Sequence, residues 1–153
     1  MSRVPVIVFC LALSAAWSLC GQPAAPPPSI APTHADLEYA PAEPASSKGH
    51  QLDMYIPSGA TRPVPVVIWT AGSAWMADTG KRSGGAMAAQ LNPAGYAVAG
   101  VSIRSSSQVK FPGQLHDIKA AVRWLRANAA KYNLDPAHIG YHRRRVPEAG
   151  PRR

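Results

Sequence analysis

Cysteine is nearly absent from this sequence, and its two cysteines lie close to the amino terminus. Cys10 and Cys20 fall in or beside an apolar segment, and no cysteine follows them. A chain body without cysteine has no disulfide framework and no thiolate metal site. Both ways of stabilising a small fold are therefore excluded for everything after Cys20.

Acidic residues are also few. The chain has 8 Asp and Glu against 16 Lys and Arg, a net charge of +8. Half of this excess lies in residues 141–153, which carry five Arg and one Glu. The remainder lacks a basic stripe interleaved with aromatic residues, so we do not expect nucleic-acid binding. A cationic peptide that associates with surfaces through its Arg tail stays an alternative.

No apolar run is long and well flanked enough to favour a permanent membrane span. Arg3 is followed by an uncharged apolar stretch from Val4 to Leu19, the pattern of a secretory signal peptide. We therefore expect residues 1–20 to be a signal peptide, cleaved near Ser18, and the protein to be exported to the periplasm or secreted. The alternative is a retained amino-terminal anchor or a lipid anchor at Cys20.

Composition divides the rest of the chain into three parts. Residues 21–47 are rich in Pro and Ala and are predicted to be an extended linker. Residues 48–140 have the alternation of packed secondary structure and form the predicted domain. Residues 141–153 form a basic tail. With 46% apolar and 16% charged residues, the overall balance is that of a globular protein.

Strands and helices alternate along the predicted domain. Alternating or continuous apolar residues predict strands at 51–56, 64–70 and 96–103, with another beginning at His138. Small, unbranched residues predict a helix over 83–91. A longer helix opens at Phe111, and its apolar residues recur on one face: Leu115, Ile118, Val122, Leu125 and Ala129. This order predicts an α/β fold.

Several blocks of the domain resemble one known family. Residues 66–75, Val-Val-Ile-Trp-Thr-Ala-Gly-Ser-Ala-Trp, resemble the strand and oxyanion loop of α/β-hydrolase esterases related to hormone-sensitive lipase and to bacterial feruloyl or acetylxylan esterases. Residues 103–104, 111–126 and 132–140 are similar to the blocks that follow in that family. The resemblance runs from Gln51 to Gly140. It implies a partial α/β-hydrolase fold, a mostly parallel sheet with flanking helices, truncated before the nucleophile elbow.

The resemblance assigns an oxyanion loop to Gly72, Ser73 and Ala74, with Trp75 beneath it as a packing residue or pocket wall. Backbone N–H groups in such a loop stabilise the charge that develops on an attacked ester carbonyl. The loop departs from the family because Ala71 replaces a common His and Ser73 and Ala74 replace glycines. An ordinary strand-to-helix turn is the alternative. Ser73 is not expected to be a nucleophile, because no Gly-x-Ser-x-Gly context surrounds it.

Arg104 and Asp117 match a residue pair that ties a strand end to the following helix in the family. A bidentate ion pair is also what their chemistry predicts, so we expect a structural pair rather than catalytic residues. His116 next to Asp117 is not expected to form a dyad, because neighbouring residues on a helix do not face one another. A solvated or hydrogen-bonded histidine is the expected outcome.

The resemblance implies a serine hydrolase of small carboxylic esters that forms an acyl-enzyme and uses no metal or organic cofactor. The nucleophile, acid and base of that family have no counterparts in this sequence, so we expect the chain to be inactive alone. Residues 141–153 have the excess of Arg, Pro, Ala and Gly expected of a GC-rich gene read in a shifted frame; the alternative is a genuine basic tail. A non-catalytic exported binding fragment using a cleft at Trp75 is the other functional alternative. An open apolar sheet edge predicts marginal stability or aggregation.

Overall fold

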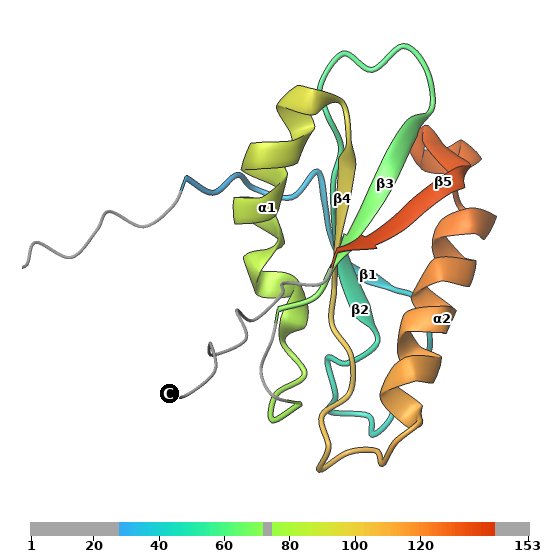
Figure 1. The fold of residues 1–153 in the computed structure, drawn as a ribbon. Helices are drawn as coiled ribbons and strands as arrows, with labels where there is room; N and C mark the ends of the chain where they lie inside the picture. The colour runs from blue at the N-terminus through green and yellow to red at the C-terminus, as the bar shows by residue number, and fades with distance from the viewer. Residues whose placement is uncertain (1–27, 72–74, 143–153) are drawn as a thin grey trace, which may run out of the picture.

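The structure is a computed structural model that describes residues 28–71 and 75–142. Five strands form one sheet, and two helices cover it (Figure 1). Short 3₁₀ helices span Gly80–Ser83, Asn92–Ala94 and Ala130–Tyr132. In chain order, the main elements are β1 (His34–Glu38), β2 (Gln51–Tyr55), β3 (Val64–Trp69), α1 (Gly84–Leu91), β4 (Ala97–Val101), α2 (Gly113–Ala127) and β5 (Leu134–His142).

The sheet has the order β1-β2-β4-β3-β5. β3 lies between β4 and β5 and runs parallel to both, whereas β2 is antiparallel to β1 and β4. The predicted α/β class and partial α/β-hydrolase fold are confirmed. The sheet is mixed rather than mostly parallel, because two of its four strand pairings are antiparallel. Because β4 and β5 lie on opposite sides of β3, the carboxyl end of β3 has a parallel neighbour on each side.

The two helices lie on opposite faces of the sheet (Figure 1). Alternate residues of β4 face each helix: Ala97, Ala99 and Val101 belong to the core cluster under α2, and Val98 to the cluster under α1. All five residues of β4 are buried. A strand covered on both faces must be apolar throughout, which is why 96–103 reads as a continuous apolar run.

The buried stripe of α2 differs from the predicted one. The helix buries Gly113, Asp117, Ala121 and Leu125, residues four apart, whereas Leu115 is 45% exposed. Ile118 and Val122 pack at the edge of the core. Ala121 and Leu125 belong to the core cluster between the helix and the sheet, and Asp117 faces inward because its partners lie there.

The amino-terminal boundary of the domain is earlier than predicted. Part of the predicted linker 21–47 is strand β1, which pairs with β2 through Leu37 opposite Leu52. Just upstream, Thr33 N donates to Met54 O at 2.7 Å and Ile30 N to Gly85 O at 3.3 Å. The Pro- and Ala-rich composition concealed the Leu37 and Tyr39 alternation that marks this strand, and Tyr39 is buried.

The carboxyl-terminal strand starts earlier than predicted and extends into the predicted tail. β5 starts at Leu134 rather than His138, and its pairing with β3 shifts register between Leu134 and Ile139. Pro136, which has no N–H to donate, lies in this irregular stretch. At the other end, Tyr141 and His142 pair with β3, so the first two residues of the predicted tail belong to the sheet.

Candidate functional site

The carboxyl ends of three parallel strands meet at one edge of the sheet. β3 ends at Trp69 and β5 at His142, and these two residues are paired across the strands, with rings stacked 5.4 Å apart. Trp69 Nε1 donates to Ser83 Oγ at 2.7 Å. The carboxyl ends of β3 and β5 therefore lie side by side. In open α/β sheets such an edge is where ligands bind.

The connection from β3 to α1 is closed at its base. Ala71 N donates to Gly80 O at 3.0 Å, so the chain leaves β3 and returns to the same place. Thr70 Oγ1 donates to Val101 O on the neighbouring strand. The space at Gly80 is restricted, since a Cβ there would lie 2.9 Å from Val101 O. The predicted oxyanion residues Gly72, Ser73 and Ala74 fall inside this connection but lie outside the described residues.

Trp75 follows directly. It is 60% exposed, and its φ of 60° is in the left-handed region. Its carbonyl oxygen accepts a hydrogen bond from Ser106 N at 2.7 Å. The contribution of Trp75 within the described structure is therefore a backbone tie between two loops of this edge.

Arg104 and Asp117 lie together, as an ion pair between the end of β4 and the second turn of α2. Arg104 Nη2 is 2.8 Å from Asp117 Oδ1, and Nε is 3.1 Å from Oδ2. The Arg104 backbone N also donates to Oδ2 at 3.0 Å. Asp117 is 2% exposed, so hydrogen bonds donated by Arg104 take the place of water at this carboxylate.

Two further groups complete this network, and sequence reasoning missed both. His50 Nε2 lies 3.1 Å from Asp117 Oδ1, and its Nδ1 contacts the carbonyl of Pro41. Glu43 Oε2 accepts from Arg104 Nη1 at 3.0 Å. These residues are 61 to 67 positions from their partners, so no local pattern connects them. His116, beside Asp117, is exposed and forms no dyad with it.

The network shifts the ionisation of its members. Burial raises the pKa of Asp117, but the hydrogen bonds from Arg104 and His50 outweigh burial and leave it below its usual range. Burial, and then the Asp117 charge, raise the pKa of Tyr39 far above its ordinary value. Tyr39 Oη lies 2.6 Å from Gly49 O and 2.7 Å from Ser102 O. This hydroxyl therefore stays protonated and links two strand ends.

A second buried ionic group is centred on Lys81, near the end of the β3–α1 connection, and was also missed. Lys81, 8% exposed, donates from Nζ to Asp53 Oδ1 on β2 at 2.8 Å and to Asp36 on β1. Asp36 has a φ of 54°, in the left-handed region, and lies where the pairing of β1 with β2 is irregular. Burial lowers the pKa of Lys81, but the two carboxylates outweigh burial and raise it. The available sequence signal was Asp53, a lone charge inside an apolar strand.

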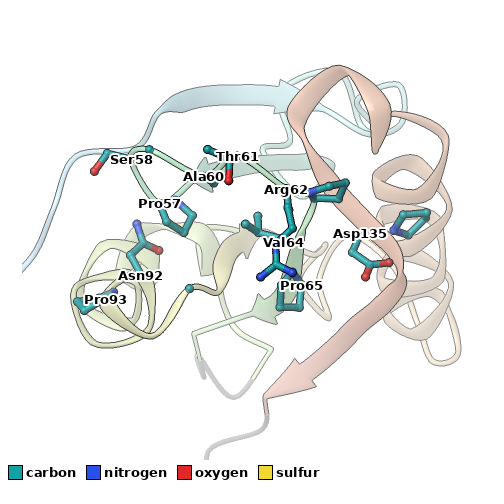
Figure 2. Close-up of a pocket in the computed structure, with 14 residues that line it drawn as sticks. Pro57, Ser58, Ala60, Thr61, Arg62, Val64, Pro65, Asn92, Pro93 and Asp135 are labelled. Atoms are coloured by element: carbon teal, nitrogen blue, oxygen red, sulfur yellow. The ribbon is translucent and has the colours of Figure 1, made fainter.

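A wide hollow of about 760 Å³ lies at the opposite edge of the sheet (Figure 2). It is bounded by residues 57–65, Asn92 to Gly95, and Asp135 with Pro136. These segments precede or begin β3, β4 and β5, so the hollow is at the amino ends of the parallel strands. It is separate from the loops that follow those strands and has no part in the candidate site.

Within residues 28–71 and 75–142, no cluster of three or more His, Cys, Asp or Glu is arranged to hold a metal ion. No helix of the same residues has the length and apolar character needed to span a bilayer.

Comparison with known proteins identifies the family to which this arrangement belongs. Residues 52–142 match the BD-FAE family, and this span is more than half of the chain. The chain belongs to the BD-FAE family. The resemblance to α/β-hydrolase esterases predicted from residues 51–140 is therefore confirmed.

Individual proteins similar to this BD-FAE chain are named as esterases. Esterase LipC of Mycobacterium tuberculosis is 31% identical over 75 residues, which cover 49% of this chain and 19% of LipC. Among solved structures, a truncated carbohydrate esterase from gut microbiota is 36% identical with a TM-score of 0.61, covering 76% of this chain and 40% of that one. A bifunctional GH43-CE protein of Bacteroides eggerthii is 40% identical with a TM-score of 0.59, covering 70% and 15%.

This BD-FAE chain spans about a fifth of the length of the curated relatives that it matches. Its descent from carboxylesterases is supported by the family and by these relatives. The described structure includes the carboxyl ends of the parallel strands, where the β3–α1 connection starts.

Proposed function

We propose that residues 48–142 form the oxyanion side of a serine carboxylic-ester hydrolase. The observation that carries this proposal is the pairing of Trp69 with His142, which puts the carboxyl ends of β3 and β5 side by side. In α/β-hydrolases one oxyanion donor comes from the β3–αA loop, and the other is the backbone N–H of the residue after the nucleophile. Loops after adjacent parallel strands are suited to serve one carbonyl oxygen together.

In the proposed reaction, a serine oxygen attacks the acyl carbon, and the carbonyl oxygen becomes negatively charged. Backbone N–H groups at Gly72, Ser73 or Ala74 would stabilise that charge, and removing one such donor raises a barrier by about 3 kcal/mol. The alcohol leaves, and water then releases the acid from the acyl-enzyme. Arg104 and Asp117 do not touch the reacting atoms in this scheme and hold the edge in place.

We further propose that this chain does not carry out the reaction by itself. Its 153 residues contain no Gly-x-Ser-x-Gly sequence, and that elbow is what exposes the nucleophile in this fold. The substrate class that we propose for the complete site is a small carboxylic ester. One solved relative is named a carbohydrate esterase, which favours an acyl ester of a sugar.

Hydrolysis of p-nitrophenyl acetate by the purified chain tests this proposal. We expect a rate equal to that of heat-denatured chain and of buffer, because the nucleophile and its base are absent. Ser73→Ala serves as the matched variant, since Ser73 carries the one hydroxyl among the three predicted oxyanion residues. Turnover by the chain that is lost in Ser73→Ala would show that the chain is a competent hydrolase with an unexpected nucleophile.

Export is a second part of the proposal, based on the basic start and apolar centre of residues 1–20. We expect the mature protein to lack this segment after expression in a bacterial host with an active secretion pathway. Intact-mass measurement of the protein from the periplasm and medium checks this. A mature protein that retains Met1 to Leu19 would contradict cleavage.

A further inference from the structure

The carboxylate of Asp78 lies where three connections of the fold meet. Its Oδ2 accepts hydrogen bonds from Ser47 Oγ at 3.1 Å, from Lys48 N at 3.0 Å and from Gln108 Nε2 at 2.8 Å. Asp78 belongs to the β3–α1 connection, Ser47 and Lys48 to the β1–β2 connection, and Gln108 to the β4–α2 connection. A single oxygen atom thus joins segments that are at least 30 residues apart.

The partners of Asp78 are themselves held in place. Ser47 is 5% exposed, and its Oγ accepts from Gly49 N at 2.9 Å. Gln108 Oε1 accepts from Ser105 N at 2.8 Å, so both ends of this amide are used. The β4–α2 connection therefore reaches the β3–α1 connection twice, through Gln108 at Asp78 and through Ser106 at the carbonyl of Trp75.

The negative charge of Asp78 is what makes three donors on one oxygen favourable. Hydrogen bonds to an ionised acceptor are stronger than those between neutral groups. The bond from Gln108 is the largest influence and, together with Lys48 N and Ser47, holds the pKa of Asp78 below its ordinary value despite partial burial. An asparagine at this position would keep one acceptor oxygen and lose the charge.

We propose that Asp78 is a positioning residue that fixes the β3–α1 connection against both neighbouring loops of the carboxyl edge. The junction is defined by Ser47, Lys48, Asp78 and Gln108. This inference rests on the proposed function, because positioning matters to catalysis only if that connection supplies the oxyanion donors. The contacts of the junction are present in the chain whether or not it hydrolyses esters.

Amide hydrogen exchange of the purified chain tests the junction segment by segment. Asp78→Ala is expected to speed exchange on the order of tenfold in residues 45–50, 75–79 and 103–109, because all three lose the shared acceptor. Exchange in β4, residues 97–101, is expected to stay unchanged. Gln108→Ala is expected to speed exchange in 103–109 and to leave 45–50 protected, since the Ser47 and Lys48 bonds remain.

The conservative variant and the pH dependence separate positioning from general support. Asp78→Asn is expected to restore part of the protection lost in Asp78→Ala. The pKa of Asp78 is lowered in the native state. The stronger protection of wild type than of Asp78→Asn is therefore present above the ordinary carboxyl pKa of about 3.9 and is lost as pH falls through the lowered value. Asp135→Ala is the matched control, since this carboxylate binds Ala137 N and His138 within β5.

Equal exchange in wild type and Asp78→Ala at all three segments would overturn the inference, as would a similar increase in 97–101. If Asp78→Ala fails to fold, Asp78→Asn and Gln108→Ala decide the matter by the same segments. Ester turnover plays no part in these measurements. A negative exchange result therefore leaves the proposed function intact, and turnover by the chain alone contradicts its proposed inactivity and leaves the junction intact.

Discussion

Replacing Arg104 by alanine is expected to lower the free energy of unfolding by about 3–5 kcal/mol, because it leaves the carboxylate of Asp117 buried without its main partner. Asp117 is 2% exposed, and the Arg104 side chain donates to both of its oxygens, whereas the variant keeps only the backbone N of residue 104 and His50 as partners. A loss of this size is a large share of the 5–15 kcal/mol typical of whole domains. Urea denaturation followed by far-ultraviolet circular dichroism measures it.

Two matched variants make the Arg104 result specific. Arg104→Lys keeps the charge but not the bidentate geometry, so we expect an intermediate loss. Arg123→Ala removes an exposed arginine from α2 and is expected to change stability by less than about 0.5 kcal/mol. Equal effects at Arg104 and Arg123 would contradict a buried ion pair.

The same pair predicts how stability depends on pH. The native pKa of Asp117 is lowered, so its contribution is fully present above the ordinary carboxyl value of about 3.9 and is lost as pH falls through the lowered value. Arg104→Ala is expected to weaken this acid sensitivity, because Arg104 is the largest influence that lowers the pKa. Parallel acid denaturation of wild type and variant checks the direction.

Replacing Lys81 by methionine is expected to cost about 2–3 kcal/mol, because Asp53 is left buried without its cation. The Asp53 side chain is only 12% exposed, whereas that of Asp36 is 69% exposed and regains water when Lys81 is removed. Methionine keeps the apolar stem of lysine, so the loss reports the ionic group rather than a cavity. Thermal or urea unfolding gives the difference.

A double-mutant cycle tests the Lys81 interaction itself. Asp53→Asn removes the buried charge and keeps an acceptor oxygen for the backbone N of Asp36, which donates to Asp53 Oδ1 at 2.8 Å. We expect Lys81→Met with Asp53→Asn to lose less than the sum of the single variants, since the double variant has no unpaired buried charge. Additive losses would mean that Lys81 and Asp53 do not interact.

The strands at the centre of the sheet were predictable because burial on both faces demands apolar residues throughout. β3 and β4 fall within residues 64–70 and 96–103, which were identified from that property alone. The order of the strands in the sheet was not predictable from any local pattern. It depends on contacts between segments that are distant in the sequence.

The part of the candidate site that could be predicted is an interaction between two residues whose chemistry alone indicates a pair. The chemistry of an arginine after a strand and a carboxylate in the next helix indicated the Arg104–Asp117 pair. Lys81 was missed because one of its two partners lies on β1, a strand concealed by the Pro- and Ala-rich composition around it. Asp78 was missed because its partners come from two other connections, which only the folded topology brings together.

The adjacency of β3 and β5 is the central structural claim, because it places the β3–α1 connection beside the end of β5. Interstrand nuclear Overhauser effects in the isotope-labelled chain test it most directly. The account predicts contacts of Val67 with both Gly140 and Val98, and of Ile68 with both Tyr141 and Ala99. Contacts of β5 with β4 in place of β3, or none from β5 to any strand, would contradict it.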